Sequence, residues 1–244
     1  MNSHLSFRSG NPALNANVFK VKSSTSNDVM TLNGAVNKTS LSLLILFCFG
    51  VIGYVANNYS FIFVGFIIGM CLALATIFKK HWSPYTVPLY AVFEGLALGS
   101  ISKVYSESYD GIVTQAIFIT FGIFSTLLFL YKSRIIKPTE NFKLGIVAAT
   151  GGIFFVYLIS FIMSFFGSGI SLIHSNGTFG IIFSLGVVVV ASLNLVLDFD
   201  FIEEASEKNV PKYMEWYSAF GLLVTLIWLY LEILRLLAKL QSRR

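Results

Sequence analysis

Residues Tyr217–Leu240 decide the class of fold, and they read YSAFGLLVTLIWLYLEILRLLAKL. Only Glu232, Arg235 and Lys239 are charged in this stretch. A helix rises about 1.5 Å per residue, so roughly 20 mainly apolar residues cross the hydrocarbon core of a bilayer. Because no water reaches that core, the backbone has to satisfy its own hydrogen bonds, and a single span does so as a helix. The stretch therefore predicts a membrane-spanning helix.

Six further apolar stretches precede this one, and most of them reach the length that a span needs. They are Leu41–Ala56, Phe61–Phe78, Pro84–Ser102, Ile112–Tyr131, Leu144–Gly167 and Phe179–Ile202. The first is short, and we expect its helix to start near Asn37. The sequence therefore predicts an all-α, integral membrane bundle of seven helices in residues 41–240. Residues 1–40 are expected to form a polar cytoplasmic tail, and residues 241–244 a short basic C-terminus.

The composition agrees with a membrane protein and argues against other classes. The chain has 244 residues, of which 55% are hydrophobic and 12% are charged, whereas soluble domains carry about twice that charged fraction. Such a chain is too hydrophobic for intrinsic disorder and for a soluble enzyme of this length. The histidines His4, His81 and His174 fall in the tail or in loops, and no P-loop, HExxH or dinucleotide motif is present. We therefore expect neither an enzyme nor a cofactor.

The basic residues predict the orientation of the chain, because lysine and arginine accumulate on the cytoplasmic side. The tail and every second loop hold 12 of them, whereas the opposite loops hold only Lys103. The 12 are Arg8, Lys20, Lys22, Lys38, Lys79, Lys80, Lys132, Arg134, Lys137, Lys143, Lys208 and Lys212. We therefore expect a cytoplasmic N-terminus. Seven crossings put the basic C-terminal end, with Lys239 and Arg243, on the other side; the alternative is a last span that does not fully cross. The net charge of +5 indicates orientation and anionic lipid rather than nucleic acid.

Small residues at four-residue spacing predict close helix contacts. Gly65 and Gly69 have this spacing in the second stretch, and Gly95 and Gly99 repeat it in the third. Ridges of small residues let helix backbones approach closely. We expect them to pack within the bundle, with a homodimer interface as the alternative.

Acidic side chains within the spans are the candidates for function. A charged group at the bilayer centre costs about 2.5–3.5 kcal/mol on insertion scales, so it is usually retained for a purpose. Glu94 lies in the middle of the third stretch. Asp198 and Asp200 lie near the end of the sixth. Glu232 lies three residues before Arg235 in the seventh, and we expect the two to form an ion pair. Acids outnumber bases within the spans, which favours a cation pathway over an anion pathway.

Asn194 and Asp198 are four residues apart, which places them on one face of a helix. Their oxygens suit a cation or a proton relay, and a transient cation at Asp198 is the one metal contact that we expect. Because burial disfavours the charged form of a carboxyl group, Glu94 and Asp198 suggest a pH-sensitive gate. Its carboxylates would be charged when open to water and neutral when sealed. The alternative is that each acid is protonated and bonded to a neighbouring helix.

Five stretches form a pattern that covers both ends and the middle of the chain. They are SGNPALN at residues 9–15, MTLNGAVNKTS at 30–40, PLYAVFEGLALGSIS at 88–102, LNLVLDFDFIEEA at 193–205 and PKYMEWYSAFGLLVTLIWLYLEILRLLAKL at 211–240. Together they resemble the bacterial branch of the Bax inhibitor-1 family of seven-helix membrane proteins. The resemblance implies six helices around a central seventh and a proposed pH-sensitive calcium leak. It also implies links to stress tolerance, and to suppression of cell death in eukaryotic relatives.

The resemblance further implies a gate of two aspartates that share a proton. Asp198 matches the aspartate of the sixth helix, and Glu94 matches the acid of the third. The position of the seventh-helix aspartate falls on Thr225, which departs from the family pattern. Glu232 lies about two turns from that position and is not an obvious substitute.

Two main functional hypotheses follow. The first is a pH-sensitive leak or homeostasis pathway for calcium ions or protons. Its candidate residues are Asp198, Glu94, Asn194, Asp200, Glu232 and Thr225. The second is a non-conducting regulator that binds other membrane proteins, such as a membrane protease. A proton-coupled transporter is a third, although no inverted repeat supports it. In each case we expect the protein in the lipid bilayer of a bacterial inner membrane.

Overall fold

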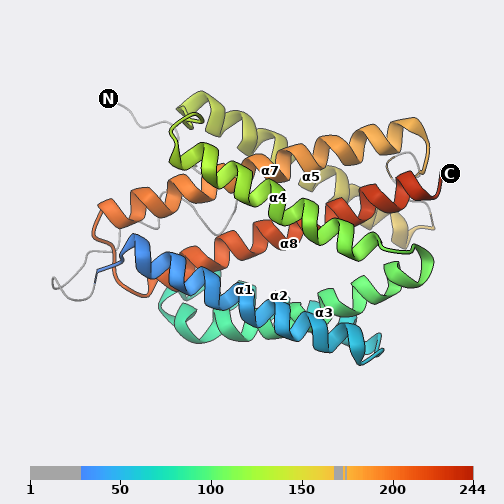
Figure 1. The fold of residues 1–244 in the computed structure, drawn as a ribbon, viewed down its shortest axis with the longest axis horizontal. Coiled ribbons are helices and arrows are strands. Elements are labelled where there is room, and N and C mark those ends of the chain that lie inside the picture. The colour runs from blue at the N-terminus through green and yellow to red at the C-terminus, as the bar shows by residue number, and fades with distance from the viewer. Residues whose placement is uncertain (1–28, 168–172, 174, 244) are drawn as a thin grey trace. The chain divides into compact units, whose positions relative to one another are not determined.

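The computed structural model describes residues 29–167, 173 and 175–243 of the chain (Figure 1). Within them, seven helices are long and apolar enough to cross a membrane. They are α1 Leu32–Val55, α2 Ser60–Phe78, α3 Ser83–Ser108, α4 Ile112–Lys132, α5 Glu140–Phe165, α7 Thr178–Glu207 and α8 Met214–Gln241, with a short 3-10 helix, η2 Lys80–Trp82, before α3. The predicted all-α, seven-helix membrane fold is confirmed. The tail up to residue 28, with SGNPALN, Arg8, Lys20 and Lys22, lies outside the described residues, as do His174 and Arg244.

The largest difference from the sequence prediction is the start of α1. The helix begins at Leu32, five residues before Asn37 and nine before Leu41. Thr31 caps it, because its hydroxyl accepts a hydrogen bond of 3.0 Å from the Gly34 N–H. The expected start near Asn37 is wrong, since the first turns of α1 are polar and begin with a capping residue rather than with an apolar run.

Contacts with the far end of the chain hold this early start in place. The Met30 N–H donates to Val210 O at 2.8 Å, in the loop between α7 and α8. The Glu215 carboxylate, in the first turn of α8, accepts from both the backbone N–H and the hydroxyl of Thr31, each at 3.1 Å. It therefore lies at the N-terminal ends of two helices, where the helix dipoles favour a negative charge. Gly34 leaves room for this carboxylate, because a Cβ atom there would overlap it.

The described residues form two compact units. The α1–α3 unit comprises residues 29–110 and Asp198–Val224, and the α4–α5 unit comprises Gly111–Leu197 and residues 225–243. α7 and α8 contribute to both units. In α8, 61% of the most apolar stretch is buried, against 11% to 17% in α1, α2, α4 and α5. The exposed apolar side chains of these four helices are typical of helices in lipid, and the central position that the resemblance implies for the C-terminal helix stays a prediction.

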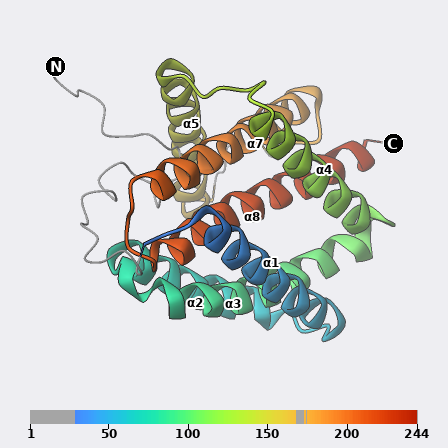
Figure 2. The same ribbon diagram turned by 60° about the vertical axis from the view of Figure 1, so that its left-hand side comes forward.

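Glycines bring α3 against α1 in the α1–α3 unit, where both views show the two helices along each other (Figures 1 and 2). A Cβ atom at Gly99 of α3 would overlap the backbone carbonyl of Gly50 in α1, and one at Gly95 would lie 2.6 Å from a backbone oxygen of α1. In return, Gly53 of α1 faces the backbone of Leu96. The two backbones are thus in direct contact, which larger side chains would prevent.

α2 packs on α3 in the same manner. A Cβ atom at Gly65 would lie 2.6 Å from Phe93 O of α3. Further along the same contact, the hydroxyl of Thr76 in α2 donates to that of Thr86 in α3 at 2.7 Å. The small residues that the sequence singled out therefore lie at helix contacts within the chain.

Replacement of Gly99 with alanine tests the close approach of α1 and α3. The added methyl group would collide with the α1 backbone, so we expect Gly99→Ala to lose about 1–3 kcal/mol of stability and to melt at a lower temperature in detergent. Gly122→Ala in α4 is the matched control, because a Cβ atom there meets nothing within 4 Å and alanine is favoured over glycine in a helix by roughly 1 kcal/mol. A Gly99→Ala protein that melts at or above the wild-type temperature would contradict the packing.

Candidate functional site

Polar side chains buried in the apolar helices are the candidate functional residues, and each of the two units contains some of them. Asp198, in α7, is 0% exposed, and its neighbours Leu197 and Phe199 are buried as well. A carboxyl group in such surroundings is costly unless it is protonated or makes polar contacts. The structure thus places this acid inside the protein rather than against lipid.

Asn194 lies one turn before Asp198 on α7 and is 2% exposed. Its side-chain Nδ2 donates to Thr150 Oγ1 of α5 at 2.8 Å and to Val190 O at 2.9 Å. Its Oδ1 atom receives no hydrogen bond from the residues that the structure describes. A buried acceptor of this kind costs about 1–3 kcal/mol unless a water molecule or an ion satisfies it. The Asn194 oxygen is therefore suited to a water molecule or a cation.

Glu94 lies on α3 and is half-buried. Its carboxyl group packs on Gly69 of α2, where a Cβ atom would overlap Oε1. Gly69 therefore leaves the space that this carboxyl group occupies. The sequence singled out Glu94 as an acid and Gly69 as a packing residue, but it carried no sign that the two are in contact.

Asp200 and Thr225 complete the set of predicted residues. Asp200 is half-buried, two residues after Asp198 on α7. Thr225, which stands where the resemblance implies a second aspartate, is 3% exposed on α8. Across the described ranges, no three His, Cys, Asp or Glu side chains gather in a way that would hold a metal ion.

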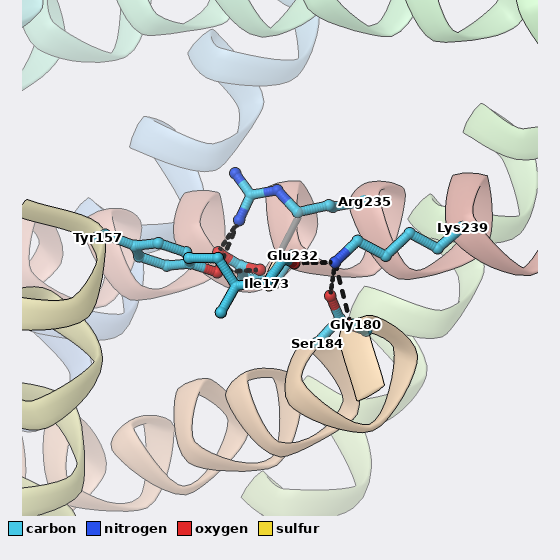
Figure 3. Close-up of polar contacts among 7 residues, drawn as sticks. All are labelled: Tyr157, Ile173, Gly180, Ser184, Glu232, Arg235 and Lys239. Atoms are coloured by element: carbon cyan, nitrogen blue, oxygen red, sulfur yellow. Dashed lines mark hydrogen bonds and ion pairs between the residues drawn. The ribbon is translucent and has the colours of Figure 1, made fainter. Parts of the chain in front are cut away.

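Glu232 and Arg235 of α8 form the ion pair that their spacing predicts (Figure 3). Arg235 Nη1 donates to Glu232 Oε1 at 2.7 Å, and Glu232 is 2% exposed. Tyr157 of α5 joins them, because its hydroxyl donates to Glu232 Oε1 at 3.1 Å and accepts from Arg235 Nη1 at 2.8 Å. The guanidinium also lies over the Tyr157 ring, 5.2 Å from its centroid. The pair is neutral as a unit and is tied to α5.

Lys239 is buried, although the sequence groups it with the basic C-terminal end of the chain. Its side chain turns toward the start of α7, and the residue is 5% exposed. The ammonium group donates to Ile173 O at 2.6 Å, Gly180 O at 3.0 Å and Ser184 Oγ at 2.8 Å (Figure 3). These oxygens take the place of water around the charge. Lys239 is therefore part of the polar interior of the α4–α5 unit.

Three partners in the site were not predicted from the sequence: Tyr157, Thr150 and Ser184. Each is a hydroxyl in a largely apolar helix, which is the signal that the sequence offers. Hydroxyls within membrane spans tend to bond to neighbouring helices. The neighbour to which each one bonds depends on how the helices pack, which the sequence alone does not reveal.

Comparison with known proteins gives one finding for nearly the whole chain. A family model described as Bax inhibitor 1 like matches residues 11–242. The matched range includes all seven described spans. A search among curated proteins returns no match.

Removal of the Tyr157 hydroxyl tests the cluster around Glu232. Tyr157→Phe takes a donor from the buried carboxylate and an acceptor from Arg235. We therefore expect a loss of about 1–3 kcal/mol of stability, measured as a lower melting temperature in detergent. Tyr85→Phe is the matched control, because Tyr85 is 76% exposed. Equal melting temperatures for the two variants would show that the network contributes nothing.

Proposed function

The chain belongs to the Bax inhibitor 1-like family of membrane proteins, and from this premise we propose that it lets cations, calcium among them, leak across the membrane in a pH-dependent manner. The observation that carries the proposal is Asp198, a fully buried acid in an apolar helix. Ionisable groups within membrane helices are expensive and usually mark ion or proton pathways. Asn194, one turn away, supports the proposal with a buried oxygen that has no donor in the described part of the chain.

The sign of the buried groups favours cations. Asp198 and Glu94 supply carboxyl oxygens, which are the ligands that calcium prefers in proteins. The charge of Arg235, on α8, is offset by its ion pair with Glu232. Acids therefore outnumber unpaired bases among these buried groups, which favours a cation over an anion.

A pH dependence follows from the role proposed for the acids. A carboxyl group sealed from water favours its neutral form, and one open to water favours its charged form. Opening would therefore release protons, and by linkage it is favoured as the pH rises. We propose a leak that is small at pH 5 and larger at pH 8.

A second candidate function is a non-conducting regulator that binds other membrane proteins. Thr225 is the observation that favours it, because a threonine stands where the family resemblance implies the second aspartate of the gate. Two carboxyl groups in contact share a proton and titrate as a pair, and a threonine hydroxyl does not replace one of them in that role. This alternative requires no ion flux at any pH.

Substitution of the acids tests the leak. We expect purified protein in liposomes with an enclosed calcium dye to give a flux that rises from pH 5 to pH 8. Asp198→Asn and Glu94→Gln should each lower that flux by about tenfold, because they remove the charge that would stabilise a passing cation by roughly 1–2 kcal/mol. Asp110→Asn is the matched control, because Asp110 is exposed in a loop, and its flux should equal that of the wild type. If the folded wild type shows no flux between pH 5 and pH 8, the leak is contradicted and the non-conducting regulator is favoured.

The distribution of basic residues gives a separate, testable orientation. We propose a bacterial inner-membrane protein with its N-terminus in the cytoplasm, so that the C-terminal end of α8 faces outward. We expect alkaline phosphatase fused after the C-terminus to be active in bacterial cells, and a green fluorescent protein fused there to be dark. Fusions after Lys80, in the connection between α2 and α3 on the proposed cytoplasmic side, should give the opposite pattern. A fluorescent C-terminal fusion would contradict seven crossings.

A further inference from the structure

The ammonium group of Lys239 joins the last turns of α8 to the first turns of α7. Two of its hydrogen bonds reach α7, to Ser184 Oγ at 2.8 Å and Gly180 O at 3.0 Å. The third reaches Ile173 O, just before α7, at 2.6 Å (Figure 3). An ammonium group has three N–H donors and no acceptor. All its donors are therefore used, and the group is held from three directions.

This inward orientation is not the usual one for a lysine near the end of a membrane helix. Such a lysine normally extends its flexible stem toward water and keeps its charge hydrated. Arg243, four residues further and just beyond the end of α8, does so: it is exposed, and its guanidinium reaches Thr178 Oγ1 only at 3.5 Å. Lys239 is 5% exposed although it lies two residues from the end of the helix. Its burial therefore serves the contact with α7.

No carboxylate of the described residues forms an ion pair with Lys239, and Glu232, which attracts its charge, is already paired with Arg235. Its three acceptors are neutral, and among the described residues the ion pair of this region joins Arg235 to Glu232 instead. A positive charge in a low-dielectric interior repels an approaching cation far more strongly than one in water does. Basic side chains in pores exclude cations in this way.

We propose that Lys239 closes the end of the α4–α5 unit where α7 begins and α8 ends. It fastens the two helices to each other, and it places an unbalanced positive charge at their contact that repels cations. The inference rests on the proposed cation leak and names the residue that keeps it shut at this end. Lys239 acts here as a positioning residue and a selectivity residue, with Ser184 as the side chain that holds it.

Calcium flux into dye-filled liposomes tests the closing role. Lys239→Met keeps the length of the side chain but removes the charge and the three hydrogen bonds, and we expect the flux to rise about tenfold. Ser184→Ala removes one acceptor and keeps the charge, so a smaller rise, of roughly two- to fivefold, is expected. Arg243→Met is the matched control, because it removes a positive charge from an exposed side chain just beyond α8, and its flux should equal that of the wild type.

Hydrogen–deuterium exchange of the same proteins reports the fastening without reference to conduction. We expect Lys239→Met, and to a lesser degree Ser184→Ala, to accelerate amide exchange in the first two turns of α7 and the last two turns of α8. Exchange in α1, α2 and α3 should not change in either variant. Arg243→Met should exchange as the wild type does throughout.

The outcomes separate this inference from the proposed function. Faster exchange with a higher flux supports the closing role. Faster exchange with an unchanged flux overturns it, because Lys239 would then be a structural contact alone, and unchanged exchange overturns the fastening itself. If the wild type shows no flux, the proposed leak is overturned. The fastening of α7 to α8 is still decided by the exchange measurement, because exchange does not depend on conduction. If Lys239→Met does not fold, Ser184→Ala decides between these results.

Discussion

Every polar group within a membrane span has to find its partner inside the protein, and this constraint organises the structure from the backbone outward. The backbone meets it by forming seven long helices. The side chains meet it through short bonds between helices, such as Thr76 to Thr86 and Asn194 to Thr150. Helices that bond in this way have to approach closely, and the glycines of α1, α2 and α3 permit that approach.

The same constraint distinguishes polar atoms that satisfy each other from those that do not. Arg235 and Glu232 satisfy each other and Tyr157, so they need no ion. The Asn194 oxygen receives no hydrogen bond from the described residues, one turn from the fully buried Asp198. At the beginning of α7, by contrast, Lys239 brings a positive charge to three neutral oxygens. An acid, Asp198, thus lies in the second half of α7, whereas a base of α8, Lys239, contacts the first turns of α7.

The sequence predicted the fold well because a span is a local property. Apolar runs of sufficient length identify seven helices, and the structure has all seven, most of them extended by a few residues at the ends. The start of α1 was missed because Thr31 and Glu215, 184 residues apart, fix it together. No local pattern contains such a contact.

The candidate site was predictable as a set of residues but not as an arrangement. An acid in an apolar run is visible in the sequence, and Asp198, Glu94 and Glu232 were found in that way. Their partners depend on how helices pack, so Gly69 beneath Glu94 and Tyr157 beside Glu232 were not foreseen. Lys239 was grouped with a basic terminus, because sequence position alone does not tell a lysine that extends toward water from one that turns inward.

The proposed leak requires that this protein alone makes a bilayer permeable to cations. The most direct measurement compares calcium flux into liposomes that contain only the purified wild-type protein with flux into protein-free liposomes of the same lipid at pH 8. We expect a flux that increases in proportion to the amount of protein added. Equal fluxes in the two preparations, with the protein shown to be folded and inserted, would contradict it.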